Sequence, residues 1–328
     1  MARIFHDTDA PLDPVQNKTV AVIGYGNQGR AWALNLRDSK LDVIVGTVAD
    51  ASQQAASDDG FPAHTVADAV AQADVICLLI PDEVMGEAVA AHIKDALKPG
   101  AAVVFASGYA VAYNEVDLPD TVDVVMVAPR MIGVGVRDSY VDGSGFIAFT
   151  GVERDATGNA WPVVLGVARA LGATKRGSVE MTFAQEATID LFVEQGIAPA
   201  LQKVWRDAAM VLLEKGIPIE AILAEFYLSG EIERTYRAMR ELGATKQWQL
   251  HSQTSQYGTA SRAERYNDVD LASRMRIAIE EITSGAFAKE WAAERAAGYP
   301  KVKALREAEG RDALMDFEDS VRRQFEPA

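Results

Sequence analysis

The chain has 328 residues, of which 49% are hydrophobic, and it carries a formal net charge of −15 with a pI near 4.8. This length and composition exclude a disordered or fibrous chain and leave room for two domains with a full core each. The excess of negative charge argues against nucleic acid or an anionic membrane as a partner.

The first 18 residues contain no apolar block of signal-peptide length, and no later stretch approaches about 18 uninterrupted apolar residues. We therefore expect a cytoplasmic protein that does not bind or span a membrane. The only cysteine, Cys77, excludes a disulfide framework. It lies in an apolar run, which favours a place in the core over a role as nucleophile.

A run of β-branched residues opens the first predicted unit and ends in a glycine-rich turn. The turn consists of Gly24, Tyr25, Gly26, Asn27, Gln28 and Gly29. A helical segment from Arg30 to Leu36 and a strand from Val43 to Gly46 follow. In such a β-α-β unit the glycines allow the tight turn, the approach of phosphate oxygens to the backbone, and close packing of the helix on the strand. The pattern predicts a dinucleotide site, with a purely structural turn as the alternative.

The loop at 47–52 occupies the place where a dinucleotide fold meets the adenosine ribose. It contains Asp50 and Ser52 and no Lys or Arg. An acid accepts hydrogen bonds from free ribose hydroxyls and repels a 2′-phosphate, so the loop favours NADH over NADPH. The alternative is that Asp50 and Ser52 only cap the next helix.

Further strands are predicted at 75–80, 102–105, 122–127, 145–150 and 178–181, and helices at 84–97 and 159–171. The carboxyl ends of parallel strands hold the ligand in doubly wound folds. Residues that follow these strands are therefore candidates for the nicotinamide side of a cofactor cleft. They are Pro81, Asp82, Ser107 and Gly108, with Gly133 as a further cofactor-binding candidate in the loop after Arg130.

From Thr182 onward the pattern changes to helix after helix. We predict an α/β cofactor-binding domain at residues 1–181 and an all-helical domain at 182–328. Glu186, Asp190 and Glu194 recur every four residues near the start of the second domain, which places them on one face of a helix. A hard cation such as Mg²⁺ would offset their mutual repulsion. A solvated acidic face is the alternative on so acidic a chain.

With these residues in view, the chain resembles the short form of the ketol-acid reductoisomerases of branched-chain amino-acid biosynthesis. The likeness is carried by six segments: 18–36 with the glycine-rich turn, 81–83, 127–129, 182–183, 190–195, and 287–306. The resemblance implies a Rossmann domain followed by a knotted helical domain, with the active site completed across a homodimer. It also implies conversion of a 2-acetohydroxy acid to a 2,3-dihydroxy acid, by a Mg²⁺-dependent alkyl shift and a hydride reduction.

The same resemblance implies roles for individual residues. Asp190 and Glu194 match the metal-binding helix, Glu225 matches a metal ligand from the partner subunit, and Ser252 matches a substrate-binding serine. Other positions depart from the family. Ser107 replaces a histidine, Arg130 replaces a lysine, and Ser229 or its neighbour Gly230 replaces the second glutamate of the partner helix.

Loss of one carboxylate mainly weakens the binding of a second metal ion, so we expect one Mg²⁺ rather than two. The alkyl shift needs both ions, whereas reduction of a small 2-oxo acid needs only nicotinamide, one electrophile and a proton donor. We therefore hypothesise that reduction persists while isomerisation is weakened or lost. Arg130 would then clamp a carboxylate, unless it is a simple exchange of one cation for another.

Two rival hypotheses remain open: a working ketol-acid reductoisomerase that tolerates these replacements, and a non-catalytic dinucleotide-binding protein. His251 adjoins Ser252 and is a candidate proton donor, with a surface or capping role as the alternative.

Overall fold

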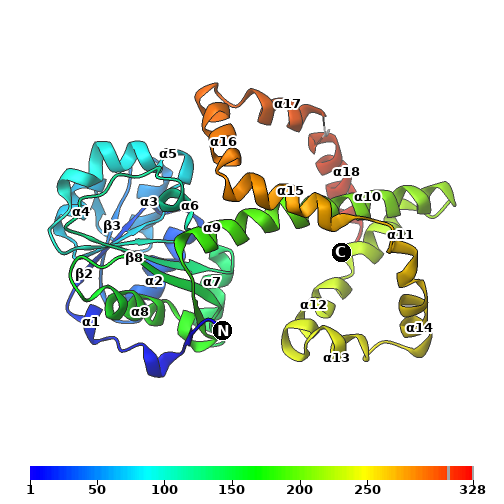
Figure 1. Cartoon of the computed structure of the whole chain (residues 1–328), viewed down its shortest axis with the longest axis horizontal. Coiled ribbons are helices and arrows are strands. Elements are labelled where there is room, and N and C mark those ends of the chain that lie inside the picture. The colour runs from blue at the N-terminus through cyan, green and yellow to red at the C-terminus, as the bar shows by residue number, and fades with distance from the viewer. Residues whose placement is uncertain (309–310, 327–328) are drawn as a thin grey trace. The chain divides into compact units, whose positions relative to one another are not determined.

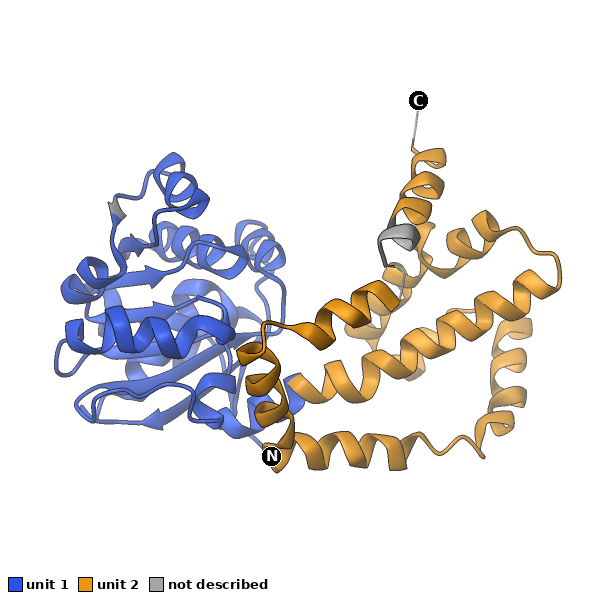
Figure 2. Cartoon of the chain, turned by 90° about the horizontal axis from the view of Figure 1, so that it is seen from above, with its two compact units in different colours: residues 1–190 blue, residues 191–328 orange. Residues whose placement is uncertain are grey.

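The computed structural model describes residues 1–308 and 311–326. The chain divides into two compact units, Met1–Asp190 and Leu191–Ala328, which Figure 2 shows in different colours. Each unit has its own architecture. The first combines a sheet with helices on both of its faces, and the regular elements among the described residues of the second are all helices.

Within the described residues, nine strands of unit 1 form one mixed sheet with the order β1-β9-β8-β7-β6-β5-β2-β3-β4. The strands are β1 (Ile4–Phe5), β2 (Thr19–Ile23), β3 (Asp42–Gly46), β4 (Ala63–His64), β5 (Val75–Leu78), β6 (Ala102–Phe105), β7 (Asp123–Pro129), β8 (Ala148–Arg154) and β9 (Ser178–Glu180). Pairing is parallel from β4 through to β7, while β8 runs antiparallel to β7 and β1 antiparallel to β9. This is the predicted Rossmann-type domain.

Helices lie on both faces of this sheet (Figure 1). The helices of unit 1 are α1 (Asp13–Gln16), α2 (Asn27–Asp38), α3 (Ala51–Asp58), α4 (Val66–Gln72), α5 (Asp82–Ala88), α6 (Tyr109–Ala112), α7 (Gly133–Val141), α8 (Ala160–Leu171) and most of α9 (Phe183–Phe192). Three short turns of other helix types complete it: η1 (Asp7–Asp9), η3 (Lys94–Ala96) and η4 (Ala173–Lys175). The π-helix η2 (Val89–Ile93) extends α5.

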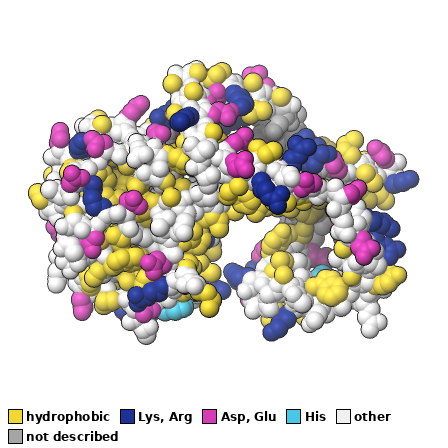
Figure 3. Space-filling view, in the orientation of Figure 1, with side chains coloured by type: hydrophobic (Ala, Val, Ile, Leu, Met, Phe, Trp, Pro, Cys, Tyr) yellow, Lys and Arg dark blue, Asp and Glu magenta, His cyan; other side chains and the backbone are white. Residues whose placement is uncertain are grey.

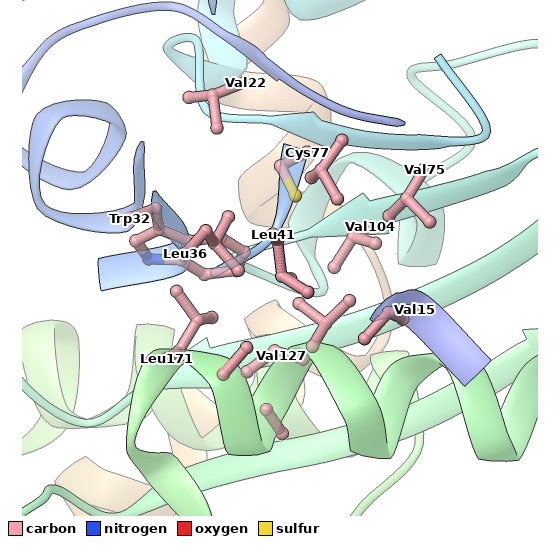
Figure 4. Packing of buried hydrophobic residues seen from close by; sticks show 14 of the residues in the cluster. Val15, Val22, Trp32, Leu36, Leu41, Val75, Cys77, Val104, Val127 and Leu171 are labelled. Atoms are coloured by element: carbon pink, nitrogen blue, oxygen red, sulfur yellow. The ribbon is translucent and has the colours of Figure 1, made fainter. Parts of the chain in front are cut away.

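Alternate residues of the strands enter two separate apolar clusters because successive side chains of a strand point to opposite faces. Val22 and Cys77 pack with Trp32 and Leu36 of α2 on one face, as Figure 4 shows. Ile23 and its strand neighbours pack with α4, α5 and η2 on the other face. Cys77 is fully buried, and burial raises the pKa of its thiol, so the predicted core role of this cysteine is confirmed.

The structure changes three details of the predicted pattern. The short edge strands β1 and β4 were not predicted, because two residues are too few to show a period. The strand expected at 145–150 begins at Ala148, since Gly145 has φ +66° in the left-handed region. The helix expected at 84–97 begins at Asp82 and continues as η2 and η3. Met85 and Val89 of this segment are buried.

Unit 2 is a succession of helices, as predicted. They are η5 (Val193–Ile197), α10 (Ala198–Glu214), α11 (Ile219–Leu223), η6 (Ala224–Leu228), α12 (Glu231–Leu242), α13 (Ala244–Trp248), α14 (Gln253–Arg262), η7 (Ala263–Tyr266), α15 (Leu271–Thr283), α16 (Ala286–Ala296), α17 (Pro300–Ala308) and α18 (Arg311–Gln324). Both η5 and η6 are π-helical turns. No helix in the described ranges combines the length and apolar character of a membrane span.

Large apolar side chains of unit 2 are widely exposed. Residues such as Val204, Trp205 and Met210 of α10 lie open, and Figure 3 shows part of this apolar surface in yellow. Buried apolar residues in the described part of this unit are far fewer, and Ile222 and Ile282 are examples. An apolar surface of this extent is typical of an interface with another polypeptide chain.

We expect Leu36→Ala to lower the free energy of unfolding by about 2–5 kcal/mol, because Leu36 is fully buried and its loss leaves a cavity between α2 and the sheet. Urea denaturation followed by circular dichroism measures the change. The control Val141→Ala removes an apolar side chain that is 67% exposed and should change stability by less than about 0.5 kcal/mol. Equal effects of the two substitutions would contradict the assignment of the core.

Candidate functional site

A cavity of about 910 Å³ opens at the carboxyl ends of β2, β3, β5 and β6. Ten of its lining residues are candidates named from the sequence: Gly24, Tyr25, Gly26, Asn27, Gln28, Asp50, Ser52, Pro81, Asp82 and Ser107. The cavity lies within unit 1, where the topology of a doubly wound sheet places a nucleotide. The structure thus brings together residues from four separate strand ends.

The glycine-rich turn has the backbone geometry that its sequence requires. Gly24 has φ +92°, a backbone conformation that residues other than glycine rarely adopt. A Cβ atom on Gly29 would stand 2.0 Å from the carbonyl oxygen of Gly24, so only glycine lets α2 start this close to the strand. A Cβ on Gly26, which is the N-cap of α2, would meet nothing within 4 Å. The first N–H groups of a helix have no partner within it and commonly receive an anion, so the open space at the N-terminus of α2 is suited to one.

A hydrogen-bonded cluster fixes the turn from behind. The Tyr25 hydroxyl donates to the Asp59 carboxylate at 2.8 Å, and Arg30 contacts both oxygens of the same carboxylate at 2.6 and 3.0 Å. The Arg30 guanidinium holds the pKa of Asp59 below its usual range. Asp59 follows α3, so it connects the glycine-rich turn to the helix that comes directly after the loop at 47–52. No local sequence pattern predicts this contact between residues 34 positions apart.

The structure of the loop at 47–52 is compatible with both interpretations of Asp50. Its carboxylate caps α3, accepting the backbone N–H of Ser52 at 2.9 Å and the Ser52 hydroxyl at 2.5 Å. These two hydrogen bonds lower the pKa of Asp50. Both residues also line the cavity, so the capping role and a cofactor-binding role are compatible.

Three predicted cofactor residues, Gly29, Gly108 and Gly133, lie outside the lining. Gly29 serves the packing described above. Gly133 lies against the backbone of the turn, where a Cβ atom would stand 1.9 Å from the carbonyl oxygen of Asn27. The lining also includes Glu87 and His92, which the sequence analysis missed. The one feature of the sequence that could have predicted them is their helical spacing from Val84, which also lines the cavity.

Arg130, at the end of β7, is held between two acids of α9. Its guanidinium donates to Glu186 Oε1 at 2.8 Å and to Asp190 Oδ1 at 2.5 Å, and it lies 4.9 Å from the ring centre of Phe149. Both terminal nitrogens of the guanidinium thus contact protein carboxylates. The clamp that the sequence predicts for a substrate carboxylate is engaged within the chain itself.

Glu186 is the buried member of this cluster, with a side chain only 1% exposed. Burial raises the pKa of its carboxyl to about 7 and outweighs the opposing effects of the Gly108 N–H and the Arg130 guanidinium. The Gly108 N–H donates to Glu186 Oε2 at 2.6 Å. Glu186 therefore joins the end of β6, next to Ser107 of the cavity, to the Arg130 cluster.

The remaining predicted residues belong to unit 2. Glu194 lies in the π-helical turn η5, and Glu225 lies exposed in η6. Ser252 caps α14 by accepting the N–H of Ser255 at 3.2 Å. The ring of His251 is hydrogen-bonded to the side chain of Gln247 at 2.7 Å.

The helix after Glu225 does not continue into the acids that follow it. Gly230 has φ +75° and starts the separate helix α12, so Glu231 and Glu233 lie beyond a break rather than one turn further along. Among the residues that the structure describes, no three His, Cys, Asp or Glu side chains gather into a group able to hold a metal ion.

Comparison with known proteins agrees with this architecture in both halves. Residues 14–177 match the domain family described as "Acetohydroxy acid isomeroreductase, NADPH-binding domain", and residues 183–326 match "Ketol-acid reductoisomerase, C-terminal domain". The chain belongs to the ketol-acid reductoisomerase family. This family consists of NAD(P)-dependent oxidoreductases, so the resemblance found in the sequence is confirmed.

Relatives of the family match over almost the whole chain. A protein named ketol-acid reductoisomerase (NADP(+)) from Methanocaldococcus jannaschii is 39% identical over 311 residues, covering 94% of each chain. One of the same name from Sulfurisphaera tokodaii is 38% identical over 329 residues, covering 99% of this chain and 97% of its own. The solved structure of an NADH-preferring ketol-acid reductoisomerase from an uncultured archaeon has a TM-score of 0.93 and 32% identity, covering 99% of this chain and 100% of its own.

The raised pKa of Glu186 predicts a pH dependence of stability. Between its ordinary value of 4.5 and about 7, the folded chain holds a proton that the unfolded chain has released. Stability therefore falls as the pH rises through this window. Glu186→Gln cannot ionise, so its free energy of unfolding relative to the unsubstituted protein should increase from about pH 5 to about pH 8. Urea denaturation in EDTA measures this, and a constant difference would contradict a raised pKa.

Proposed function

We propose that this chain is an NADH-dependent oxidoreductase that reduces a small 2-oxo acid, with the alkyl-migration step of its family weakened or lost. Bound NADH would supply the hydride for the carbonyl carbon and leave as NAD⁺, and solvent would supply the proton that completes the alcohol. In this proposal residues 1–181 bind the cofactor. Residues 182–328 contribute metal ligands, substrate contacts and the subunit interface.

The observation that carries the proposal is the pairing of Arg130 with both Glu186 and Asp190. The carboxylate chemistry of Asp190 suits Mg²⁺, which prefers oxygen ligands. However, the guanidinium already neutralises that carboxylate at 2.5 Å. Each terminal nitrogen of the guanidinium carries a second hydrogen that can donate to a carbonyl oxygen, which is the electrophilic help that hydride transfer needs.

The metal ligands that the family resemblance suggests fit one ion better than two. Asp190 and Glu194 lie on consecutive helical turns, and Glu225 of the partner subunit would complete the set. Such an ion would supply Lewis-acid polarisation of the substrate oxygens. The position one turn after Glu225 is Ser229, which offers no carboxylate for a second ion. A bridged pair of ions is what the alkyl shift requires, so this loss falls on isomerisation.

A working ketol-acid reductoisomerase is the second candidate. It is favoured by the similarity to proteins of that name. The two matching domain families cover residues 14–177 and 183–326 of this chain. Under this hypothesis the serine and arginine replacements are tolerated, and the substrates are 2-acetohydroxy acids.

Oxidation of NADH with 2-acetolactate and with 3-hydroxy-3-methyl-2-oxobutanoate, each with and without Mg²⁺, separates the candidates. We expect turnover of the second compound and little or none of the first, because only the first requires migration of an alkyl group. Comparable turnover of both would support a working reductoisomerase and overturn the proposal. Cofactor binding without any turnover would indicate a non-catalytic dinucleotide-binding protein.

We further propose that the cofactor is NADH, because Asp50 lines the cavity in a loop that lacks Lys and Arg. Asp50→Asn tests this, since asparagine also caps a helix while removing the negative charge. We expect NADPH to bind several-fold more tightly to this variant, with α3 intact, as measured by cofactor fluorescence and circular dichroism. Asp50→Ala is the matched control that loses the cap as well. An unchanged NADPH affinity in Asp50→Asn would argue against the charge as the discriminator.

We also propose that the functional form is a homodimer in which unit 2 supplies the interface. The exposed apolar side chains of α10 are the support for this proposal. Sedimentation equilibrium should give twice the chain mass of 35.4 kDa or a higher multiple. A monomer at micromolar concentration would contradict it.

A further inference from the structure

The segment that carries Arg130 is bonded directly to the turn that lines the cofactor cavity. Gln28 Nε2 donates to the carbonyl oxygen of Met131 at 3.0 Å, across 103 positions of sequence. The other end of the same amide, Gln28 Oε1, accepts from Trp32 Nε1 at 3.2 Å. Trp32 is fully buried. Gln28 is thus fixed in orientation by the core on one side and holds the neighbour of Arg130 on the other.

A second contact makes this junction stiff. Gly133 begins α7, and its Cα lies so near Asn27 that a Cβ atom would stand 1.9 Å from the Asn27 carbonyl oxygen and 3.0 Å from the Gln28 nitrogen. Two backbones in such contact cannot shift independently. Further along, Arg137 of α7 donates to Asn35 of α2 at 2.8 Å. The two helices therefore hold each other over their length.

Arg130 is also tied to the cavity from the other side. Its partner Glu186 accepts the N–H of Gly108, and Ser107 beside it lines the cavity. Arg130 therefore lies between two connections that both end at the cofactor cavity. One runs through Gln28 and Met131, and the other through Glu186 and Gly108.

We propose that Gln28 is a positioning residue that couples occupancy of the dinucleotide cavity to the placement of Arg130. A pyrophosphate received by the first turn of α2 orders Asn27 and Gln28, and the Gln28 amide transmits this order to the Met131 carbonyl. Arg130 is then held where it acts on substrate. This inference rests on the proposed function for the role of Arg130, but the coupling itself is a property of unit 1.

The experiment compares Gln28→Met with Arg137→Met in the full-length chain. Gln28→Met is close in size and neutral, and it removes the bond to Met131 together with the bond from Trp32. Arg137→Met removes two bonds between the same two helices, to Asn35 and to Asp38, and neither touches Met131 or the cavity. Hydrogen exchange of the backbone amides of residues 131–136 is measured with and without saturating NADH, whose binding is confirmed by its fluorescence. Steady-state reduction of 3-hydroxy-3-methyl-2-oxobutanoate is measured in parallel.

We expect NADH to slow exchange at residues 131–136 in the unsubstituted chain and in Arg137→Met, and not in Gln28→Met at full NADH occupancy. We expect kcat to fall about ten- to a hundredfold in Gln28→Met, while KM for NADH changes little, because a misplaced group slows the chemical step. Arg137→Met should keep its kcat.

Three results would overturn the coupling: no effect of NADH on these amides in the unsubstituted chain, a full effect in Gln28→Met, or equal loss in both variants. The last would show that general loosening of α2 against α7 is responsible. If no 2-oxo acid is reduced, the proposed function fails, and the exchange measurement still decides whether the coupling exists.

Discussion

Close contact between backbones at the start of α2 is the constraint on which the cofactor side of this structure depends. Gly29 places the helix against the Gly24 carbonyl, and Gly133 places the loop after β7 against the Asn27 carbonyl. Each contact leaves no room for a Cβ atom. Three chain segments therefore converge within one turn of α2, and the glycine-rich turn that lines the cavity is packed directly against the loop after β7.

The electrostatics of the second cluster follow from burial. Glu186 is almost completely removed from water, where a lone carboxylate is unfavourable. The Gly108 N–H and the Arg130 guanidinium supply its hydrogen bonds, and Arg130 uses its remaining terminal nitrogen on Asp190. A lysine in the place of Arg130 offers a point charge rather than a planar fork, so it would bridge two carboxylates less well. The proposal that reduction persists while alkyl migration is weakened rests on this difference in shape between arginine and lysine.

Unit 2 has the opposite character to unit 1. Its helices form, but they bury few of their large apolar side chains, and those of α10 are exposed. Hydrophobic surface of this kind is stabilised when a second surface removes it from water. Glu225 and Ser252 belong to this unit, so the proposed metal and substrate contacts are carried by the part of the chain for which we propose a partner subunit.

The sequence alone was sufficient to predict the strand-turn-helix at 19–36, the buried strand around Cys77, the helical second half and the strand ends that line the cavity. These follow from local periodicity and glycine placement, which act over a few residues, and the family resemblance extended them to the whole chain. Contacts between distant residues needed the tertiary structure. Tyr25 contacts Asp59, Gln28 contacts Met131, and Arg130 contacts Glu186 because the order of the strands and the packing of α3 and α9 bring these segments together. No local pattern records which side chains converge there, since that depends on strand order and on the depth to which each residue is buried.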